Sequence, residues 1–197
     1  PHDPNFELNF YSLLIGWIFE KYLAHVDSIY EFGCGPAYNL VELAKMYPDK
    51  KLHGLEWVNP SLEIIRLLAE KNEYKITGHL FDMFNPTELE VEPNSAFLSI
   101  NAFEQLGTKF ENLLQFAINK KPAIFVQIET FLEFCDPDNL SDVLNIKHNL
   151  KRNYLRGYVT RLRELEAEGK IAIIKAHKVE CGGLFTSAYS YVIWKPI

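Results

Sequence analysis

The chain has 197 residues, 48% of them hydrophobic, and a formal net charge of −6 at pH 7. This length and this apolar content suffice for one domain with a layered core, and the acidic balance disfavours a nucleic-acid partner, which requires a basic surface. The three cysteines, Cys34, Cys135 and Cys181, are far apart and form no CxxC motif, a pattern typical of reduced thiols in a cytoplasmic protein.

The first predicted element is an amphipathic helix within residues 1–27. Its apolar residues recur at helical spacing, at Phe10, Leu13, Leu14, Trp17 and Ile18. The apolar run in residues 13–19 is too short to cross a membrane and follows no basic signal-peptide region, so no membrane partner is expected. We expect this helix to pack on a single α/β domain formed by residues 28–197.

Strands and helices are predicted to alternate along the rest of the chain. The predicted strands are Ser28–Phe32, Lys51–Trp57, Ile76–Phe81, Ala96–Ile100, Ala123–Ile128, Ile171–Ala176 and Ala188–Trp194. The predicted helices are Tyr38–Met46, a helix from Asn59 or Ser61 to about Lys71, Glu104–Asn119, and a long helical pattern from Leu140 to Glu168. Gly169 caps the long pattern, and Gly157 inside it predicts either a kink or two helices end to end.

This alternation predicts a parallel sheet with helices on both faces. No helix separates the last two predicted strands, so these strands are expected to pair directly, in antiparallel orientation. The segment Asn85–Pro93 is polar and predicts a loop or a single helical turn.

Two glycines follow the first predicted strand, in the segment Glu31-Phe32-Gly33-Cys34-Gly35-Pro36-Ala37. Glycines at such a turn let the backbone approach a ligand without a Cβ clash. The dinucleotide fingerprint G-x-G-x-x-G would need its third glycine at Tyr38, and a Walker-type loop would need a lysine that this segment lacks. Glu31 at the strand end suits a ligand with positive charge and would repel a pyrophosphate.

The same segment resembles the first motif of class I S-adenosylmethionine-dependent methyltransferases, E/D-x-G-x-G-x-G, with Ala37 in place of the third glycine. The cofactor of that family carries an ammonium and a sulfonium group but no phosphate. The resemblance extends from about Ser28 to Trp194. It implies S-adenosylmethionine as cofactor and a Rossmann-like, doubly wound α/β sheet of seven strands, mostly parallel with the last strand antiparallel.

Further candidate cofactor contacts follow the next strands. Glu56 ends the second strand, where a carboxylate can accept hydrogen bonds from both ribose hydroxyls, and Trp57 can lie against the adenine ring. The resemblance places Asp82 and Met83 at the adenine, and Asn101 on the methyl-transfer side. The predicted cofactor site comprises Glu31, Gly33, Cys34, Gly35, Glu56, Trp57, Asp82, Met83 and Asn101.

The reaction is predicted by elimination. The segment Ser99–Phe103 resembles neither the N/D-P-P-Y/F motif of amine and amide methyltransferases nor the Pro-Cys of cytosine C5 enzymes. O-methylation of a small polar acceptor, such as a sugar, is therefore favoured. The acceptor oxygen must lose a proton, and His148, Glu104 and Glu129 are the candidate catalytic bases, unless positioning alone suffices. The run 136–139, Asp-Pro-Asp-Asn, is more typical of a turn and helix N-cap, so no metal site is predicted.

One stretch of the chain is basic: residues 145–163 contain no acid. Its cationic residues are Lys147, Lys151, Arg152, Arg156, Arg161 and Arg163. We interpret it as a solvated helix face, with a grip on an anionic or sugar-linked acceptor as the alternative. Together with Gly182-Gly183 and the Tyr189, Tyr191 alternation, it resembles sugar O-methyltransferases of surface-polysaccharide pathways.

Two alternative functions stay open. The chain could be an S-adenosylmethionine-binding subunit without catalysis, or an NAD-linked oxidoreductase, which Tyr38 and Glu31 disfavour.

Overall fold

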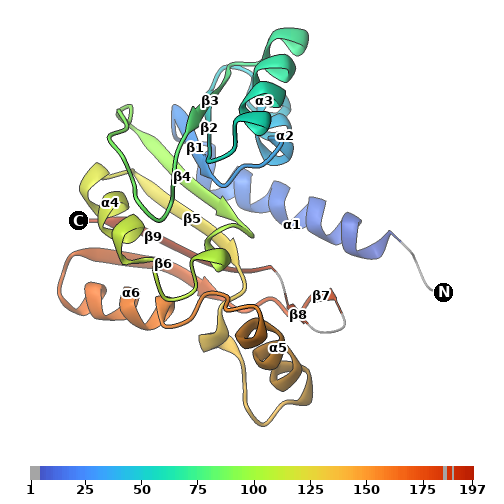
Figure 1. Ribbon diagram of the computed structural model, residues 1–197, viewed down its shortest axis with the longest axis vertical. Helices are drawn as coiled ribbons and strands as arrows, with labels where there is room; N and C mark the ends of the chain where they lie inside the picture. Colours follow the sequence, from blue (N-terminus) through green and yellow to red (C-terminus); the bar gives the residue numbers. More distant parts are fainter. Residues whose placement is uncertain (1–4, 184–185, 188) are drawn as a thin grey trace.

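The computed structural model of the chain describes residues 5–183, 186–187 and 189–197. The elements, in which η denotes a 3₁₀ helix, are in chain order α1 (Phe6–Leu23), β1 (Ser28–Phe32), α2 (Tyr38–Met46), β2 (Lys51–Glu56), α3 (Asn59–Asn72), β3 (Ile76–Leu80), β4 (Ser95–Ile100), η1 (Phe103–Leu106), α4 (Glu111–Lys120), β5 (Ile124–Glu129), η2 (Leu132–Phe134), α5 (Leu140–Lys151), α6 (Tyr158–Ala167), β6 (Ile171–His177), β7 (Gly182–Gly183), β8 (Thr186–Ser187) and β9 (Ser190–Pro196) (Figure 1).

Seven strands form one sheet in the order β3-β2-β1-β4-β5-β9-β6. The first five strands of this order are parallel, and β9 is antiparallel to both of its neighbours. The predicted α/β fold, with its doubly wound, mostly parallel sheet and antiparallel last strand, is therefore confirmed. The strand order reverses between β1 and β4, and a parallel sheet binds ligands at such a point, beyond the carboxyl ends of its strands.

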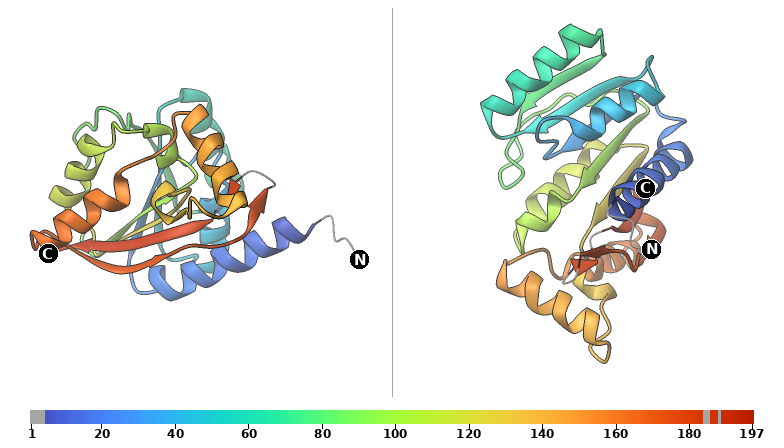
Figure 2. Two further views of the ribbon diagram at one scale, coloured as in Figure 1. Left: turned by 90° about the horizontal axis from the view of Figure 1, so that it is seen from below. Right: turned by 90° about the vertical axis from the view of Figure 1, so that its right-hand side faces the viewer.

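Helices cover both faces of the sheet. The helices α1, α2 and α3 pack on one face and α4 and α6 on the other, as the edge-on view shows for α1, α4 and α6 (Figure 2). Strands β1 and β4 are buried along their whole length, as expected for central strands of a parallel sheet that is covered on both faces. The second face has an aromatic core, built mainly from Phe32, Phe97, Phe103, Phe125, Tyr158 and Trp194.

Helix α1 packs on the core through a face that includes only part of the predicted stripe, with Ile18 of that stripe fully buried. Its buried residues are Ile15, Ile18, Phe19 and Leu23. Of the predicted apolar stripe, Leu13 is 74% exposed and Trp17 is 45% exposed, although Phe10 and Leu14 pack partly against the core. The helix carries apolar residues on more than one side, so periodicity alone could not select the buried face. No helix of the described residues is long and apolar enough to cross a membrane.

Two predicted helices are interrupted. The predicted helix Glu104–Asn119 is in fact η1 followed by α4, because the chain turns at Gly107, whose φ is +60°. The long pattern from Leu140 to Glu168 is two helices, α5 and α6, and Gly157 with φ of +80° immediately precedes the second. The two-helix alternative was right, but six residues that are not α-helical separate the helices.

Local residues explain other element ends. The N-cap of α3 is Val58, which makes no side-chain capping hydrogen bond, so neither Asn59 nor Ser61 caps this helix. Pro60 lies in the first turn of α3, where its missing N–H is not needed. Asn139 caps α5, since its side-chain oxygen accepts hydrogen bonds from the N–H groups of Ser141 and Asp142. The run 136–139 is thus a turn and an N-cap. The start predicted for the last strand, Ala188, lies outside the described residues, and β9 runs from Ser190 to Pro196.

Candidate functional site

A cavity of about 220 Å³ lies where β1, β2, β3 and β4 reach their carboxyl ends. It brings together five predicted cofactor residues, Gly33, Glu56, Trp57, Asp82 and Met83. Its wall also contains Leu55, Phe81, Phe84, Ala102 and Gln105. The sequence pattern gave no sign of Gln105 as a wall residue, because this residue lies in η1, before the break in the predicted helix at residue 107.

The turn after β1 needs glycine for two different reasons. Gly33 has a φ of +63°, and a Cβ atom on it would lie 2.6 Å from the Cβ of Ala102. Gly35 also has a positive φ, of +52°, but a Cβ there would meet no atom within 4 Å. Gly33 is therefore required by packing, whereas the space beside Gly35 is open to a ligand. Ala37, at the position of the third motif glycine, adopts a left-handed conformation with φ of +67°.

Glu56 connects the end of β2 to this turn. Its Oε2 accepts a hydrogen bond from the Gly35 N–H at 2.9 Å, and its Oε1 accepts one from the Trp57 N–H at 2.8 Å. Each carboxylate oxygen can accept a further hydrogen bond. Glu56 can therefore hold the turn and still receive two ligand hydroxyls. Trp57 is 70% exposed at the rim of the cavity.

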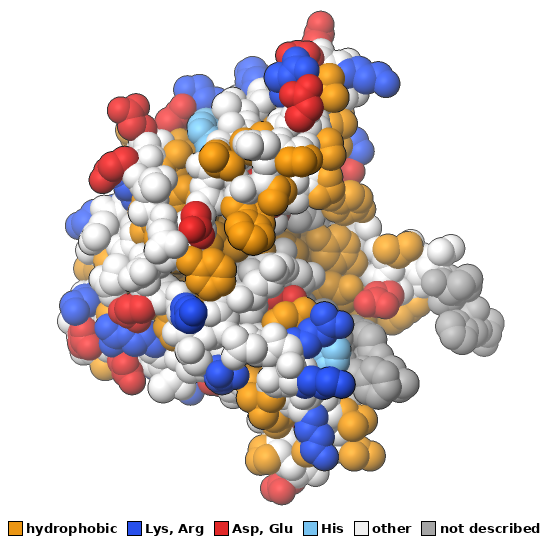
Figure 3. All heavy atoms as spheres, in the orientation of Figure 1, with side chains coloured by type: hydrophobic (Ala, Val, Ile, Leu, Met, Phe, Trp, Pro, Cys, Tyr) orange, Lys and Arg blue, Asp and Glu red, His pale blue; other side chains and the backbone are white. Residues whose placement is uncertain are grey.

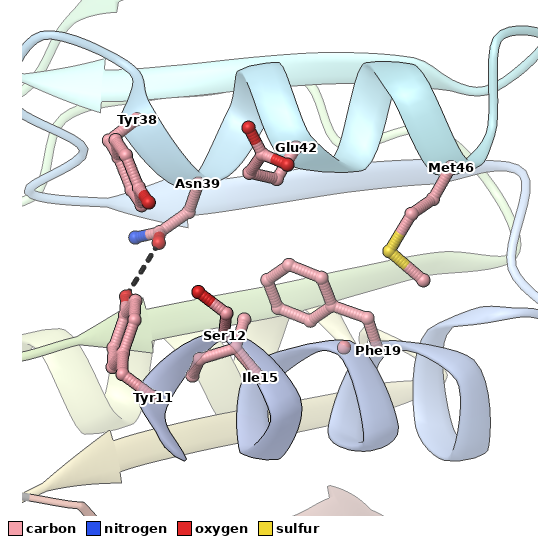
Figure 4. A pocket seen from close by; sticks show the side chains of 9 residues that line it. Tyr11, Ser12, Ile15, Phe19, Tyr38, Asn39, Glu42 and Met46 are labelled. Carbon is pink, nitrogen blue, oxygen red and sulfur yellow. Dashed lines mark hydrogen bonds between the residues drawn. The ribbon is translucent and has the colours of Figure 1, made fainter. Parts of the chain in front are cut away.

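Glu31 is a buried carboxyl group with one oxygen unused. Its Oε1 accepts a hydrogen bond from Asn39 Nδ2 at 2.7 Å, while Oε2 has no hydrogen-bond partner among the described residues. Burial raises the pKa of Glu31 to about 8, although the Asn39 hydrogen bond acts in the opposite direction. Asn39 in turn accepts a hydrogen bond from the Tyr11 hydroxyl at 2.7 Å, across the space between α2 and α1 (Figure 4). A buried oxygen without a partner is unfavourable, and a cationic ligand group would satisfy it.

Other predicted cofactor residues contribute less directly. Both oxygens of Asp82 accept hydrogen bonds within its own turn, from the Phe84 N–H and from Asn85 Nδ2, and these bonds lower its pKa. The Cys34 thiol is buried against β2, next to Gly54. Asn101 donates its N–H to the carbonyl of Ile128 at 3.0 Å and has an exposed side chain. The ligand contacts assigned to these three residues stay predictions.

Glu129, one of the candidate bases, organises the loop after β4. It is fully buried, and its Oε1 accepts hydrogen bonds from the Ser99 hydroxyl and from the N–H groups of Ala102 and Phe103. Its Oε2 accepts a hydrogen bond from the Glu104 N–H at 3.2 Å. Burial raises the pKa of Glu129 to about 8, and the Ser99 hydrogen bond lowers it. With both oxygens engaged by the chain, this carboxylate serves first to position the loop.

Glu104 and His148 are the other two candidate bases, and both lie next to Tyr154. The Tyr154 side chain hydrogen-bonds to Glu104, and the His148 ring centroid lies 6.4 Å from that of Tyr154. Burial raises the pKa of Glu104 to about 7, against the lowering effects of this hydrogen bond and of the Arg152 charge. Tyr154 is a site residue that sequence reasoning missed, because its position depends on the break between α5 and α6.

Within the described part of the chain, no group of three or more His, Cys, Asp and Glu side chains could hold a metal ion. Asp136 accepts a hydrogen bond from the Asp138 N–H, and Asn139 caps α5, so the oxygens that could have suggested a metal site serve the turn.

No protein-family model matches the sequence, and no curated protein sequence matches it. The fold, however, is similar to those of solved methyltransferases. Geranyl diphosphate C-methyltransferase from Streptomyces coelicolor A3(2), in complex with S-adenosyl-L-homocysteine, superposes with a TM-score of 0.67 at 10% identity, over 100% of this chain and 87% of that one.

Magnesium protoporphyrin IX methyltransferase from Synechocystis PCC 6803, also with S-adenosyl-L-homocysteine bound, gives a TM-score of 0.66 at 9% identity, over 97% and 83% of the two chains. The O-methyltransferase of a trans-AT polyketide synthase from Brevibacillus brevis gives a TM-score of 0.63 at 12% identity, over 94% of this chain and 71% of that one. The chain therefore has the Rossmann-like fold that these methyltransferases share.

Proposed function

We propose that this protein is an S-adenosylmethionine-dependent methyltransferase. The observation that carries the proposal is the arrangement of two carboxylates around the turn after β1: Glu31 has an unused buried oxygen, and Glu56 faces the cavity beside the open space at Gly35. These two hydrogen-bond acceptors suit a ligand with a cationic end and the two hydroxyls of a ribose. The fold supports the proposal, because methyltransferases of similar fold were crystallised with S-adenosyl-L-homocysteine bound.

The cofactor residues would share the ligand as follows. Glu31 would face its ammonium end, and Glu56 would accept hydrogen bonds from the ribose hydroxyls. Trp57 and Met83 would pack on the adenine ring, with Asp82 near its amino group. When bound, S-adenosylmethionine supplies an electrophilic methyl group.

The favoured reaction is O-methylation of a small polar acceptor. Transfer to oxygen requires removal of the hydroxyl proton, and Glu104 is the favoured base: it lies between the cavity-wall residues Ala102 and Gln105 in the chain, and its pKa of about 7 suits proton transfer near neutral pH. Its partner Tyr154 would orient the carboxylate through their hydrogen bond. Glu129, whose oxygens are engaged, would hold the loop that carries Glu104. His148 lies in the same region and remains the alternative base.

An anionic acceptor, such as a phosphorylated or nucleotide-linked sugar, is supported by the basic residues of α5 and the segment after it. Lys147, Lys151 and Arg152 are exposed, and no carboxylate of the described residues lies within ion-pair distance of them. Basic side chains gather over α5 on this face of the molecule (Figure 3). Arg152 lies 5.9 Å from the Tyr154 ring, beside Glu104. Arg161, by contrast, is paired with Glu111, Glu164 and Glu168 and is not free to bind a ligand.

Calorimetry with S-adenosylmethionine, S-adenosylhomocysteine and NAD tests the proposal. We expect the first two ligands to bind and NAD not to bind, and binding of NAD alone would overturn the assignment. Glu56→Ala should weaken S-adenosylhomocysteine binding at least about tenfold, since two ribose hydrogen bonds are lost, and an unchanged affinity would refute the ribose role.

The reaction is then tested by transfer of a labelled methyl group to a panel of sugars, nucleotide sugars and small phenols. Tight cofactor binding with no transfer to any acceptor would indicate instead a cofactor-binding subunit without catalysis. Transfer only to phosphorylated acceptors, reduced by Lys147→Ala and Arg152→Ala but not by Arg163→Ala, would support the anionic acceptor.

A further inference from the structure

We propose that Tyr11 of α1 is a positioning residue: it fixes the Asn39 amide so that Glu31 keeps its second carboxylate oxygen directed to the cationic end of the ligand. This inference rests on the proposed function, because it takes that cationic end to be the ammonium group of S-adenosylmethionine.

The hydrogen bonds form a directed series from α1 to β1. The Tyr11 hydroxyl donates to Asn39 Oδ1 at 2.7 Å, and Asn39 Nδ2 donates to Glu31 Oε1 at 2.7 Å. An amide whose oxygen accepts from a hydroxyl must turn its NH₂ group the other way. An ionised carboxylate only accepts, so Glu31 selects the NH₂ end of Asn39, and the Tyr11 hydroxyl anchors the other end of the amide. Without that hydroxyl, Asn39 loses its anchor on α1 and donates to Glu31 from a less fixed position.

The surroundings hold Tyr11 in place. Its ring centroid lies 5.4 Å from that of Tyr189, whose hydroxyl donates to Glu7 Oε1 at 3.0 Å. Tyr11 and Asn39 point toward each other and are hydrogen-bonded at one end of a cavity of about 80 Å³ between α1 and α2, as the close-up shows (Figure 4). The ring therefore stays packed when the hydroxyl alone is removed, and Tyr11→Phe tests the hydrogen bond rather than the fold.

The groups around Glu31 make its titration interpretable. The titratable groups that sense its charge are Tyr11 from α1 and Cys34 from the turn after β1. Burial raises the pKa of both groups, and the negative charge of Glu31 raises it further. Both groups therefore stay neutral throughout the range from pH 6 to pH 9. Tyr38 and Tyr189 also act on Tyr11 in the same direction. In that range Glu31 is the group of this cluster that changes charge.

The experiment compares the wild-type protein, Tyr11→Phe and the control Tyr22→Phe, which lies on the same helix but takes no part in the Tyr11–Asn39–Glu31 series. The first readout needs no ligand: the Glu31 carboxyl carbon is titrated by NMR and identified by its absence from Glu31→Gln. We expect the Glu31 pKa to rise by roughly half to one unit in Tyr11→Phe, because its ionised form loses an oriented donor, and to stay unchanged in Tyr22→Phe.

The second readout is the dissociation constant of S-adenosylhomocysteine between pH 6 and 9. The ligand's own ionisation affects all three proteins equally, so the ratio of variant to wild type isolates the protein. We expect Tyr11→Phe to bind roughly three- to tenfold more weakly at pH 7, with the ratio falling toward one by pH 9 as Glu31 ionises in both proteins.

An unchanged Glu31 titration, or a ratio that does not depend on pH, would overturn the positioning role, because a merely structural defect would weaken binding equally at every pH. If the wild-type protein does not bind S-adenosylhomocysteine, the proposed function is wrong and the ligand part of this inference falls with it. The NMR titration still decides separately whether Tyr11 acts on Glu31 through Asn39.

Discussion

Replacement of Glu129 should destabilise the fold strongly, because its carboxylate accepts several hydrogen bonds from the loop after β4. The Glu129→Ala change leaves three backbone N–H groups without their acceptor, and two of them belong to Ala102 and Phe103, which are 3% and 0% exposed. A buried donor without a partner costs about 1–3 kcal/mol. Two such donors predict a loss of unfolding free energy of roughly 2–6 kcal/mol, before any relaxation of the loop after β4.

The isosteric change Glu129→Gln tests the geometry more finely. It keeps one acceptor oxygen but places an NH₂ group against the Glu104 N–H, which lies 3.2 Å from Oε2. We therefore expect an intermediate loss of about 1–3 kcal/mol. Urea unfolding followed by circular dichroism measures both variants, with Glu88→Gln on an exposed carboxylate as the control. Unfolding midpoints equal to that of the wild type would refute the role assigned to these hydrogen bonds.

Three further predictions concern the same edge of the sheet. The folded-state pKa of Glu31 is about 8, above its ordinary value of 4.5, so its contribution to stability is complete below pH 4.5 and is lost as the pH rises to 8. In urea unfolding, the unfolding free energy of Glu31→Gln should therefore fall less steeply with pH over that range than that of the wild type, by up to roughly 1.4 kcal/mol per pH unit. Identical slopes of unfolding free energy against pH would contradict this. Gly33→Ala should lower the unfolding free energy by about 2 kcal/mol or more, because the new Cβ would contact Ala102. Gly35→Ala should cost only about 1 kcal/mol of backbone strain and should instead weaken S-adenosylhomocysteine binding. A larger loss of stability in Gly35→Ala than in Gly33→Ala would count against this assignment. Glu104→Gln should lower kcat about 10²-fold or more without changing cofactor affinity, and wild-type kcat should rise with pH to a plateau above about 7, where the base is ionised; an unaltered kcat would remove Glu104 from the mechanism.

The sheet and much of the wall of the cavity could be predicted because they follow from short-range patterns. Apolar strands that alternate with helices leave few possible topologies, and a parallel sheet brings the ends of its strands to one edge. Glu31, Gly33, Glu56 and Asp82 each follow from a position at a strand end, so the topology alone placed them close together.

The errors have physical causes that sequence patterns do not reveal. Apolar residues keep helical spacing across Gly107, yet the chain turns there, and a Cβ on that glycine would lie 2.8 Å from the Asn153 carbonyl oxygen. The role of Glu129 depends on the backbone N–H groups of Ala102 and Phe103, and any residue type other than proline would supply the same groups. Tyr11 and Tyr154 belong to the site only through tertiary packing.

The insertion of β9 between β5 and β6 also constrains the order of events on the ribosome. The strands β1 to β5 can pair as soon as they are synthesised, but β6 has no neighbour in the sheet until β9, the last strand, is made. During that interval β5 presents an open edge of apolar residues, the kind of edge that pairs with other chains. The nascent protein therefore passes through a stage at which aggregation competes with completion of its own sheet.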